Sequence, residues 1–364
     1  MRNPPERSRG MTRQQRFSRY LTGTGALLAS GALLSGCGLA SGPTDDGEVT
    51  LRLSHQWPAA EDGEGDFRAV LAERFAEQVE ERTDGSVTVE LHPNNSLIED
   101  PTEQYSAIRE QTLDMSVYPL DYAAGDVPEF SMTLMPAMVR NHAQAQNWKD
   151  SEIGDRIAEI SEENGVRILT WVWNAGALGT AGDEPIRTPD DVPSGSVTRA
   201  AGPKVEEMLE DVGFGLSSMP SSDIYNALQT GTLDSAITST SSFSSYRLYE
   251  QVETFTSPAG GNTFWFMFEP LIIGTESYDQ LTEEQQETVD EVGADLQEFA
   301  YTASEEDDQR VHEEFEENGV EVVEMSDSDF DEWREASQPA WESFGEEVEG
   351  GEELLELGES VPAE

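Results

Sequence analysis

The sequence has one cysteine, Cys37, so no disulfide can form within one copy of the chain. Lysine is almost as rare, with only Lys149 and Lys204, whereas aspartate and glutamate total 74 of the 364 residues. The formal charge of −53 excludes a surface that binds nucleic acid. After residue 37 no apolar run approaches the roughly 20 residues that a membrane-spanning helix needs. A packed core must therefore hold the fold, and the length suffices for one or two α/β domains.

The acidic residues are spread along the whole chain. Removal of residues 1–37 as a leader would take away six arginines and one glutamate, which changes the formal charge from −53 to −58. Carboxylates at this density repel one another unless salt screens them, and the Debye length falls to about 3 Å at 1 M ionic strength. The composition therefore predicts a solvated acidic surface that is suited to high salt.

The first 37 residues have the layout of a secretory signal. Six arginines lie in the first nineteen residues, and an apolar, glycine-rich run follows over Tyr20–Gly36. The run ends in Leu-Ser-Gly-Cys at Leu34–Cys37, which matches a lipobox, where small residues precede a cysteine that is acylated after cleavage. An uncleaved anchor is the alternative, but the run is short for a spanning helix. We therefore predict a lipid on Cys37 and an extracytoplasmic protein anchored at the outer face of the cytoplasmic membrane.

The remaining chain alternates apolar strands with amphipathic helices, which is typical of parallel sheets with ligand loops at the strand C-termini. The elements that we expect are strands at Val49–Leu53, Val87–Leu91, Met115–Tyr118, Val166–Trp173, Thr263–Phe268 and Val320–Val323, with helices at about 67–83, 102–111, 143–164, 282–317 and 329–349. The strand Thr263–Phe268 is predicted to return to the first sheet, and Thr282 with Gln285 forms a capping box for the long helix.

The domain organisation that follows is two α/β domains with a ligand cleft at the hinge between them. The predicted divisions are a flexible tether at 38–47, domain I at 48–174 plus about 262–300, domain II at 175–261 plus about 301–349, and a loosely packed acidic tail at 350–364.

The segment Pro185–Asp234 places one arginine, Arg199, at the end of a short strand in a region with two predicted helices whose ends are clearly marked in the sequence. Pro203 begins the first helix and Gly213 follows its end, the usual asymmetry of proline and glycine at helix termini. Ser222 is predicted to cap the second helix. A fixed cation at such a strand end is suited to binding an anion.

The order of motifs in this segment resembles the solute-binding subunits of tripartite ATP-independent periplasmic (TRAP) transporters, the DctP family. In that family Pro-Ile-x-Thr-Pro-x-Asp leads to a Gly-x-Lys-x-Arg strand, and here Gly195–Arg199 reads Gly-Ser-Val-Thr-Arg. A second block, Glu-Val-Tyr-x-Ala-Leu-Gln-x-Gly-x-x-Asp, is matched by Asp223–Asp234. Weaker matches are His92–Leu97 and Pro128–Phe130. The resemblance covers nearly all of Val49 to about Glu349 and implies a periplasmic-binding-protein fold of the Venus-flytrap type, with a long helix that spans both domains.

The resemblance further implies a receptor that binds an organic acid outside the membrane and hands it to an ion-gradient-driven permease. We expect no catalysis, no cofactor and no metal ligands in this sequence, although some relatives hold a metal between the protein and the carboxylate. Arg199 would hold the substrate carboxylate through two hydrogen bonds, which guanidinium geometry allows and lysine geometry does not. The alternative for any single arginine is a surface ion pair with one of the many carboxylates.

Two departures from the family pattern concern the substrate. The Gly-x-Arg element of many members reads Gly176-Ala177-Leu178 here, so a second cation is missing, and Thr238 stands where the family has asparagine. One carboxylate anchor in a less polar pocket favours a monocarboxylate with an apolar, aromatic or keto body over a dicarboxylate. The predicted pocket walls come from the ends of strands. They are Gln56, Trp57, Tyr118, Trp173, Asn174, Thr238 and Trp265.

Two other function classes stay open from the residues. A binding protein of an ATP-driven importer has the same cleft, although the Arg199 segment argues against it. An extracytoplasmic hydrolase has little support, because the sequence holds neither a Gly-x-Ser-x-Gly elbow nor a His-Glu-x-x-His motif.

Overall fold

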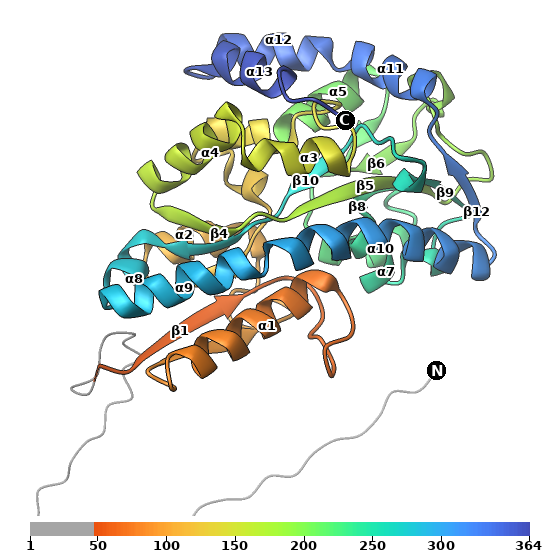
Figure 1. Ribbon diagram of the computed structural model, residues 1–364. Coiled ribbons are helices and arrows are strands. Elements are labelled where there is room, and N and C mark those ends of the chain that lie inside the picture. Colours follow the sequence, from red (N-terminus) through yellow and green to blue (C-terminus); the bar gives the residue numbers. More distant parts are fainter. Residues whose placement is uncertain (1–46) are drawn as a thin grey trace, which may run out of the picture. The chain divides into compact units, whose positions relative to one another are not determined.

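The structure, a computed structural model, describes residues 47–364. The predicted signal, Cys37 and the tether up to residue 46 lie outside the described residues. Two sheets organise residues 47–364, which are mixed α/β as the sequence predicts (Figure 1). None of the helices in this range is both long and apolar enough to cross a membrane.

The first sheet has five strands in the order β2-β1-β3-β11-β4. Their bounds are β1 (Val49–Ser54), β2 (Val87–His92), β3 (Met115–Val117), β4 (Val166–Thr170) and β11 (Leu271–Gly274). β1 is parallel to β2 and β3, whereas β11 is antiparallel to β3 and β4. Side chains of β11 alternate between two core clusters, with Ile272 in one and Leu271 and Ile273 in the other, because successive strand residues point to opposite faces.

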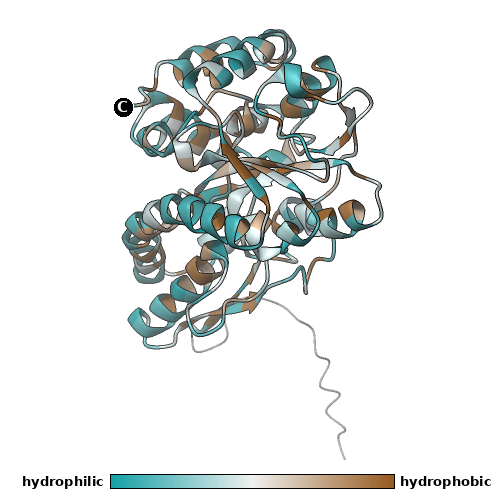
Figure 2. Cartoon of the chain, turned by 90° about the vertical axis from the view of Figure 1, so that its right-hand side faces the viewer, coloured by the Kyte–Doolittle hydropathy of each residue, from teal (hydrophilic) through white to brown (hydrophobic). Residues whose placement is uncertain are grey.

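Helices cover both faces of this sheet. On one face Phe75 of α1 and Val289 of α9 share a core cluster with β1, and on the other face Trp148 of α3 and Ile157 of α4 pack with Ile272. The helix bounds are α1 (Phe67–Arg82), α2 (Gln104–Arg109), α3 (His142–Lys149), α4 (Glu152–Glu163), α8 (Thr275–Asp279) and α9 (Glu283–Asp295). Figure 2 shows the consequence, since the outer helices carry hydrophilic residues and the inner strands hydrophobic ones.

The second sheet has seven strands, six of them in the order β12-β9-β5-β8-β6-β7, with β10 paired to β5. Their bounds are β5 (Trp173–Thr180), β6 (Val197–Arg199), β7 (Gly215–Leu216), β8 (Ser235–Ser239), β9 (Thr254–Ser257), β10 (Phe266–Phe268) and β12 (Glu321–Glu324). The helices around it are α5 (Pro203–Asp211), α6 (Ile224–Gln229), α7 (Thr240–Ser245), α10 (Gln297–Glu317), α11 (Asp327–Ala336) and α12 (Gln338–Glu347).

The chain passes between the sheets three times. It leaves the first sheet through Trp171-Val172 and returns through Glu269-Pro270, and the two passages are joined because the Glu269 N–H donates to the Val172 carbonyl at 2.8 Å. The third passage is from α9 to α10, which follow each other along one direction across the described unit (Figure 1). The predicted long helix is therefore two helices that meet at Leu296, and its capping box at Thr282 and Gln285 is confirmed.

Three sequence expectations differ from the structure. The return to the first sheet is made by β11, because β10 pairs with β5 of the second sheet instead. Ser222 does not cap α6, since it lies inside a 3₁₀ turn at Ser221–Asp223 that precedes the helix. In place of a loose tail, Gly351–Glu359 forms helix α13, which buries Leu354 against the core cluster of the first sheet.

Candidate functional site

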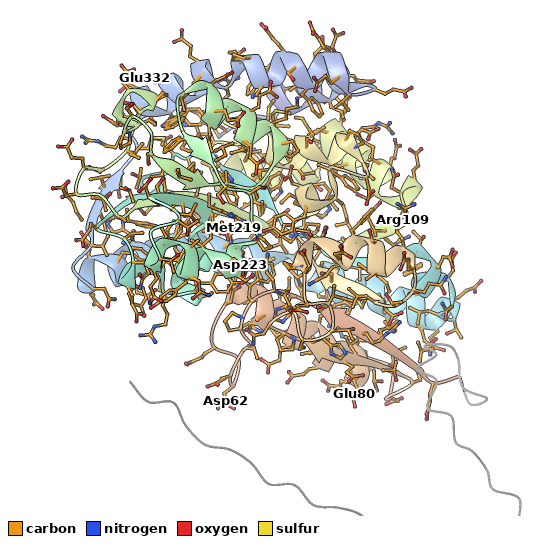
Figure 3. All side chains as sticks on the ribbon, turned by 180° about the vertical axis from the view of Figure 1, so that it is seen from behind. Asp62, Glu80, Arg109, Met219, Asp223 and Glu332 are labelled. Carbon is orange, nitrogen blue, oxygen red and sulfur yellow. The ribbon has the colours of Figure 1, made fainter. Side chains whose placement is uncertain are left out.

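Arg199 is the last residue of β6 and lies beside Ala236 of the parallel strand β8. Its side chain is only 1% exposed. Nε donates to the Met219 carbonyl at 2.8 Å, Nη1 to the Ile237 carbonyl at 2.9 Å and Nη2 to the Tyr122 hydroxyl at 3.1 Å. Tyr122 follows β3 of the first sheet, whereas the two carbonyls belong to the second. The guanidinium therefore lies where the two halves meet, near the labelled Met219 in Figure 3.

A second buried arginine, Arg68, differs from Arg199 in the partners of its guanidinium group. Arg68 lies in the first turn of α1 and is fully buried, and all five of its N–H groups have partners. Two of these partners are the carboxylates of Asp66 and Glu269, each 2.7 Å from the guanidinium. Arg199 uses three of its five N–H groups, and among the residues of the described range no carboxylate lies within ion-pair distance of it. Arg199 is thus a buried cation with two N–H groups that can still donate to an anion.

We call Asp66, Arg68, Ser239, Ser242 and Glu269 the Arg68 cluster. The Arg68 Nη atoms donate to the hydroxyls of Ser239 (2.9 Å) and Ser242 (3.2 Å), so the cluster joins the start of α1 to the second sheet. Burial alone would raise the carboxyl pKa values. The Arg68 charge and four donated hydrogen bonds still hold the pKa of Asp66 below its ordinary value, whereas Glu269 receives fewer donors and burial raises its pKa.

A cavity of about 310 Å³ lies beside Arg199, and we call it the Asp121 cavity. Its wall contains Tyr122 and Met219, which are two of the three groups bonded to the guanidinium. The residues that line it are Thr102, Asp121, Tyr122, Ala124, Gly125, Ala201, Gly202, Pro203, Glu206, Ser218, Met219 and Pro220. The wall therefore combines small apolar groups with hydroxyls and two carboxyls, and it carries no lysine, arginine or histidine.

Asp121 is the unusual member of this wall. Its side chain is 3% exposed, and neither carboxyl oxygen has a hydrogen-bond partner in the part of the chain that the structure describes. Burial raises the pKa of Asp121 well above its ordinary range, the Glu206 charge raises it further, and the Arg199 charge opposes both. The other carboxylate, Glu206, accepts a hydrogen bond from the Ser218 hydroxyl at 2.6 Å.

Of the predicted wall residues, Gln56 and Trp57 lie at the contact between the halves. The Gln56 side-chain oxygen accepts from the Ser221 hydroxyl at 3.1 Å, and the Trp57 indole N–H donates to Ser242 at 3.3 Å. The Trp57 ring also lies under the guanidinium of Arg68, 3.8 Å from its carbon. Neither residue lines the Asp121 cavity.

Tyr118, Asn174 and Trp173 have different places. Tyr118 meets Tyr122 edge to face with ring centroids 6.1 Å apart, so it supports the residue that bonds to Arg199. Asn174 donates to Ser241 at 2.9 Å, away from Arg199. Trp173 packs in the core of the first half, against Trp148, Phe266 and Phe268.

Thr238 and Trp265 belong to the second sheet. Thr238 follows Ile237, whose carbonyl accepts from Arg199, and pairs with Ala177 of β5. The Trp265 ring covers Gly176 so closely that a Cβ there would lie 2.1 Å from it. None of these five residues from Tyr118 to Trp265 lines the Asp121 cavity.

The comparisons with known proteins identify the family of this chain. The profile of bacterial extracellular solute-binding protein family 7, DctP, matches residues 59–347. A solute-binding protein of Albidiferax ferrireducens is 37% identical over 312 residues, which cover 85% of this chain and 91% of that protein. The chain belongs to the DctP family.

Solved structures of TRAP solute-binding proteins have the same fold. One from Rhodoferax ferrireducens with bound malonate is 36% identical, covers 85% of this chain and 98% of its own, and superposes with a TM-score of 0.82. One from Chromohalobacter salexigens with bound D-glucuronate is 23% identical, covers 86% of this chain and all of its own, and has a TM-score of 0.77. This chain is accordingly a TRAP solute-binding protein and not an enzyme. The hydrolase alternative is therefore excluded.

Leu178 is the residue that the sequence resemblance sets against the second arginine of many family members. In the structure it is buried in a core cluster with Ile237 and Trp265. A charged side chain there would need a partner that this apolar cluster does not offer.

Sequence reasoning missed Arg68, Asp121 and Tyr122. The partners of Arg68 are up to 201 positions away along the chain, so no local pattern marks it. Asp121 and Tyr122 lie in a 3₁₀ turn, Leu120–Ala123, that continues β3. The one available signal was their position directly after a predicted strand, where ligand loops of an α/β sheet lie.

Proposed function

We propose that this chain is the receptor of a TRAP transporter that captures an organic acid outside the cytoplasmic membrane and delivers it to the ion-gradient-driven permease. The observation that supports the proposal is Arg199, a buried cation that has no ion pair within residues 47–364 and two of whose three partners line a cavity. A cavity of about 310 Å³ is at the small end of the range for small-molecule sites. The ligand carboxylate would take the remaining N–H groups of Arg199, two hydrogen bonds that are both assisted by charge.

A monocarboxylate fits this site better than a dicarboxylate. Arg199 bonds to Tyr122 and Met219 of the cavity wall, which itself carries no lysine, arginine or histidine, whereas Glu206 on that wall disfavours a second carboxylate. The relative from Rhodoferax ferrireducens holds malonate, which has two carboxylates, so the loss of affinity for such acids would be a property of this chain. Ala124, Ala201 and Pro203 offer apolar surface to the carbon body of the ligand.

A thermal-shift screen at high salt tests the proposal. The panel contains monocarboxylates (pyruvate, lactate, benzoate), dicarboxylates (malonate, succinate), sugar acids (glucuronate) and the matching uncharged alcohols and sugars, with calorimetry on each compound that stabilises the protein. We expect a monocarboxylate to raise the melting temperature and its uncharged analogue to have no effect. Stabilisation by uncharged compounds with no response to any acid would refute the proposal.

Movement of the two halves would open and close the site. The proposed domains are 48–174 with about 262–300, and 175–261 with about 301–349. The two sheets and the three passages between them support this division. Hydrogen bonds across the contact, such as Tyr122 to Arg199 and Ser221 to Gln56, would form on closure.

The lipid anchor at Cys37 is part of the proposal and has its own test. We expect Cys37→Ser to move the protein from the membrane to the soluble fraction, because the acylated thiol is then absent. Ser35→Ala, which keeps a small residue before the cysteine, serves as the control and should stay in the membrane fraction. Persistent membrane association of Cys37→Ser would show that the leader is an uncleaved anchor.

The charge of the chain predicts a dependence of stability on salt. We expect the melting temperature to rise as NaCl increases from about 0.1 M to about 2 M, because screening weakens the repulsion between surface carboxylates. Sucrose at matched osmolality controls for solute exclusion, which stabilises without screening. Full stability in dilute buffer would contradict the prediction.

A further inference from the structure

The carboxyl group of Asp121 has no structural partner. Both oxygens are buried and accept no hydrogen bond from any of the described residues. A buried polar group in this state costs about 1 to 3 kcal/mol, and a charged one more. Such a cost is typical of binding sites, where a group is kept ready for a ligand.

Asp121 lies between Gly202 and the cavity that we named after it. On one side Gly202 approaches so closely that a Cβ there would lie 3.0 Å from Oδ2, and Gly202 has φ of +99°, which suits glycine alone. On the other side Asp121 is one of the residues that line the Asp121 cavity, with its carboxyl oxygens buried behind the wall. Gly202 is the N-cap residue of α5. Because neither Asp121 oxygen accepts a hydrogen bond from the described residues, Asp121 does not cap this helix.

Asp121 is also not a counter-ion in contact with Arg199. The two groups interact electrostatically, yet the arginine donates to two carbonyls and a tyrosine hydroxyl instead. The other titratable groups that face Asp121 are Glu206 on α5 and the tyrosines Tyr118 and Tyr122. A buried cation and a buried carboxyl that lie near one another without contact can be joined by a ligand with an anionic end and a donor group.

We propose that Asp121 determines specificity, by bonding to a hydroxyl group of the bound acid while Arg199 holds its carboxylate. The ligand class is then a hydroxy-monocarboxylate. This inference rests on the proposed function. A hydroxyl fits better than an ammonium group, because burial raises the pKa of Asp121, and a hydroxyl can pair with either protonation state of the carboxyl group.

Calorimetry with matched ligand pairs tests the inference. Each pair differs by one hydroxyl, as lactate and propionate, or 3-hydroxybutyrate and butyrate, and alanine supplies an ammonium group in the same place as the lactate hydroxyl. We expect wild-type protein to bind at least one hydroxylated acid about 10- to 100-fold more tightly than its deoxy partner. Asp121→Ala should reduce that preference to less than about threefold.

Two further variants make the result interpretable. Asp121→Asn keeps the shape and one acceptor, so it should retain part of the preference if Asp121→Ala folds poorly. Asp126→Asn removes an exposed carboxylate five residues away and should change nothing. A preference that survives Asp121→Ala, or alanine as the tightest ligand, would overturn the inference while carboxylate binding stands. No response to any acid would instead refute the proposed function.

Stability of the unliganded protein gives an independent readout. The folded pKa of Asp121 is raised, so above its ordinary pKa the unfolded chain has released a proton that the folded chain retains. This group therefore lowers stability as pH rises from that value to the folded pKa. We expect Asp121→Asn to raise the melting temperature at neutral pH, and the difference from wild type to shrink in acid. A carboxyl with a purely structural role would show the opposite sign.

Discussion

Arg199→Ala should lower the affinity for the carboxylate ligand by at least about 100-fold. Two charge-assisted hydrogen bonds contribute roughly 1.5 to 3 kcal/mol each, a large share of the roughly 8 kcal/mol of a micromolar complex. The residues that line the Asp121 cavity include no lysine, arginine or histidine that could replace the guanidinium. Isothermal titration calorimetry with the tightest acid from the screen measures the effect.

Arg199→Lys separates charge from geometry at the same position. Lysine keeps the positive charge but offers one compact ammonium group, which cannot bond both carboxylate oxygens while it also bonds the Met219 and Ile237 carbonyls. We expect this variant to bind at least about tenfold more weakly than wild type. An affinity within twofold of wild type would refute the role of two parallel hydrogen bonds.

The control for both variants is Arg187→Ala, which removes an exposed arginine twelve residues earlier in the same segment. It should leave affinity and stability unchanged. Both Arg199 variants leave buried carbonyl groups without a donor, so some loss of stability is expected, and circular dichroism must show that they are folded under the conditions of the titration. Unchanged binding by folded Arg199→Ala would disprove the site.

The position of Arg199 could be predicted because it depends on local order alone. The strand Val197–Arg199, the proline at the start of α5 and the glycine after it all lie within a few residues of one another. The capping box at Thr282 is local in the same way. Helix ends and caps of this kind involve residues that are close in the sequence, so they can be predicted from it.

The wall of the site could not be predicted with the same success, because it depends on pairing between distant segments. Trp173 and Tyr118 both end predicted strands, although Trp173 in fact begins β5, and nothing local shows that the first packs in the core while the second supports Tyr122. Similarly, β10 and β11 are short apolar strands separated by Glu269-Pro270, and composition does not assign them to different sheets. In α13, four glutamates mask an apolar side, which becomes evident only in the structure, where Leu354 packs against its neighbours.

Arg68→Met should be the most destabilising substitution outside the hydrophobic core, with a loss of about 3 to 5 kcal/mol in the free energy of unfolding. Methionine fills much of the volume but leaves Asp66 and Glu269 buried together without a cation. It also removes the donors to Ser239 and Ser242, and therefore a direct link between α1 and the second sheet. Urea denaturation at high salt measures the loss.

The same substitution on the exposed side of α1, Arg74→Met, is the matched control. Arg74 lies over the Phe299 ring with its guanidinium carbon 4.0 Å from the centroid and forms no buried ion pair, so its loss should cost less than about 1 kcal/mol. The triple variant Arg68→Met, Asp66→Asn, Glu269→Gln should recover much of the stability, because the cost comes from the unpaired carboxylates and not from the missing attraction. If Arg68→Met alone stays within about 1 kcal/mol of wild type, the Arg68 cluster does not hold the two halves together, and the other contacts across the passages, such as Glu269 to Val172, must do so.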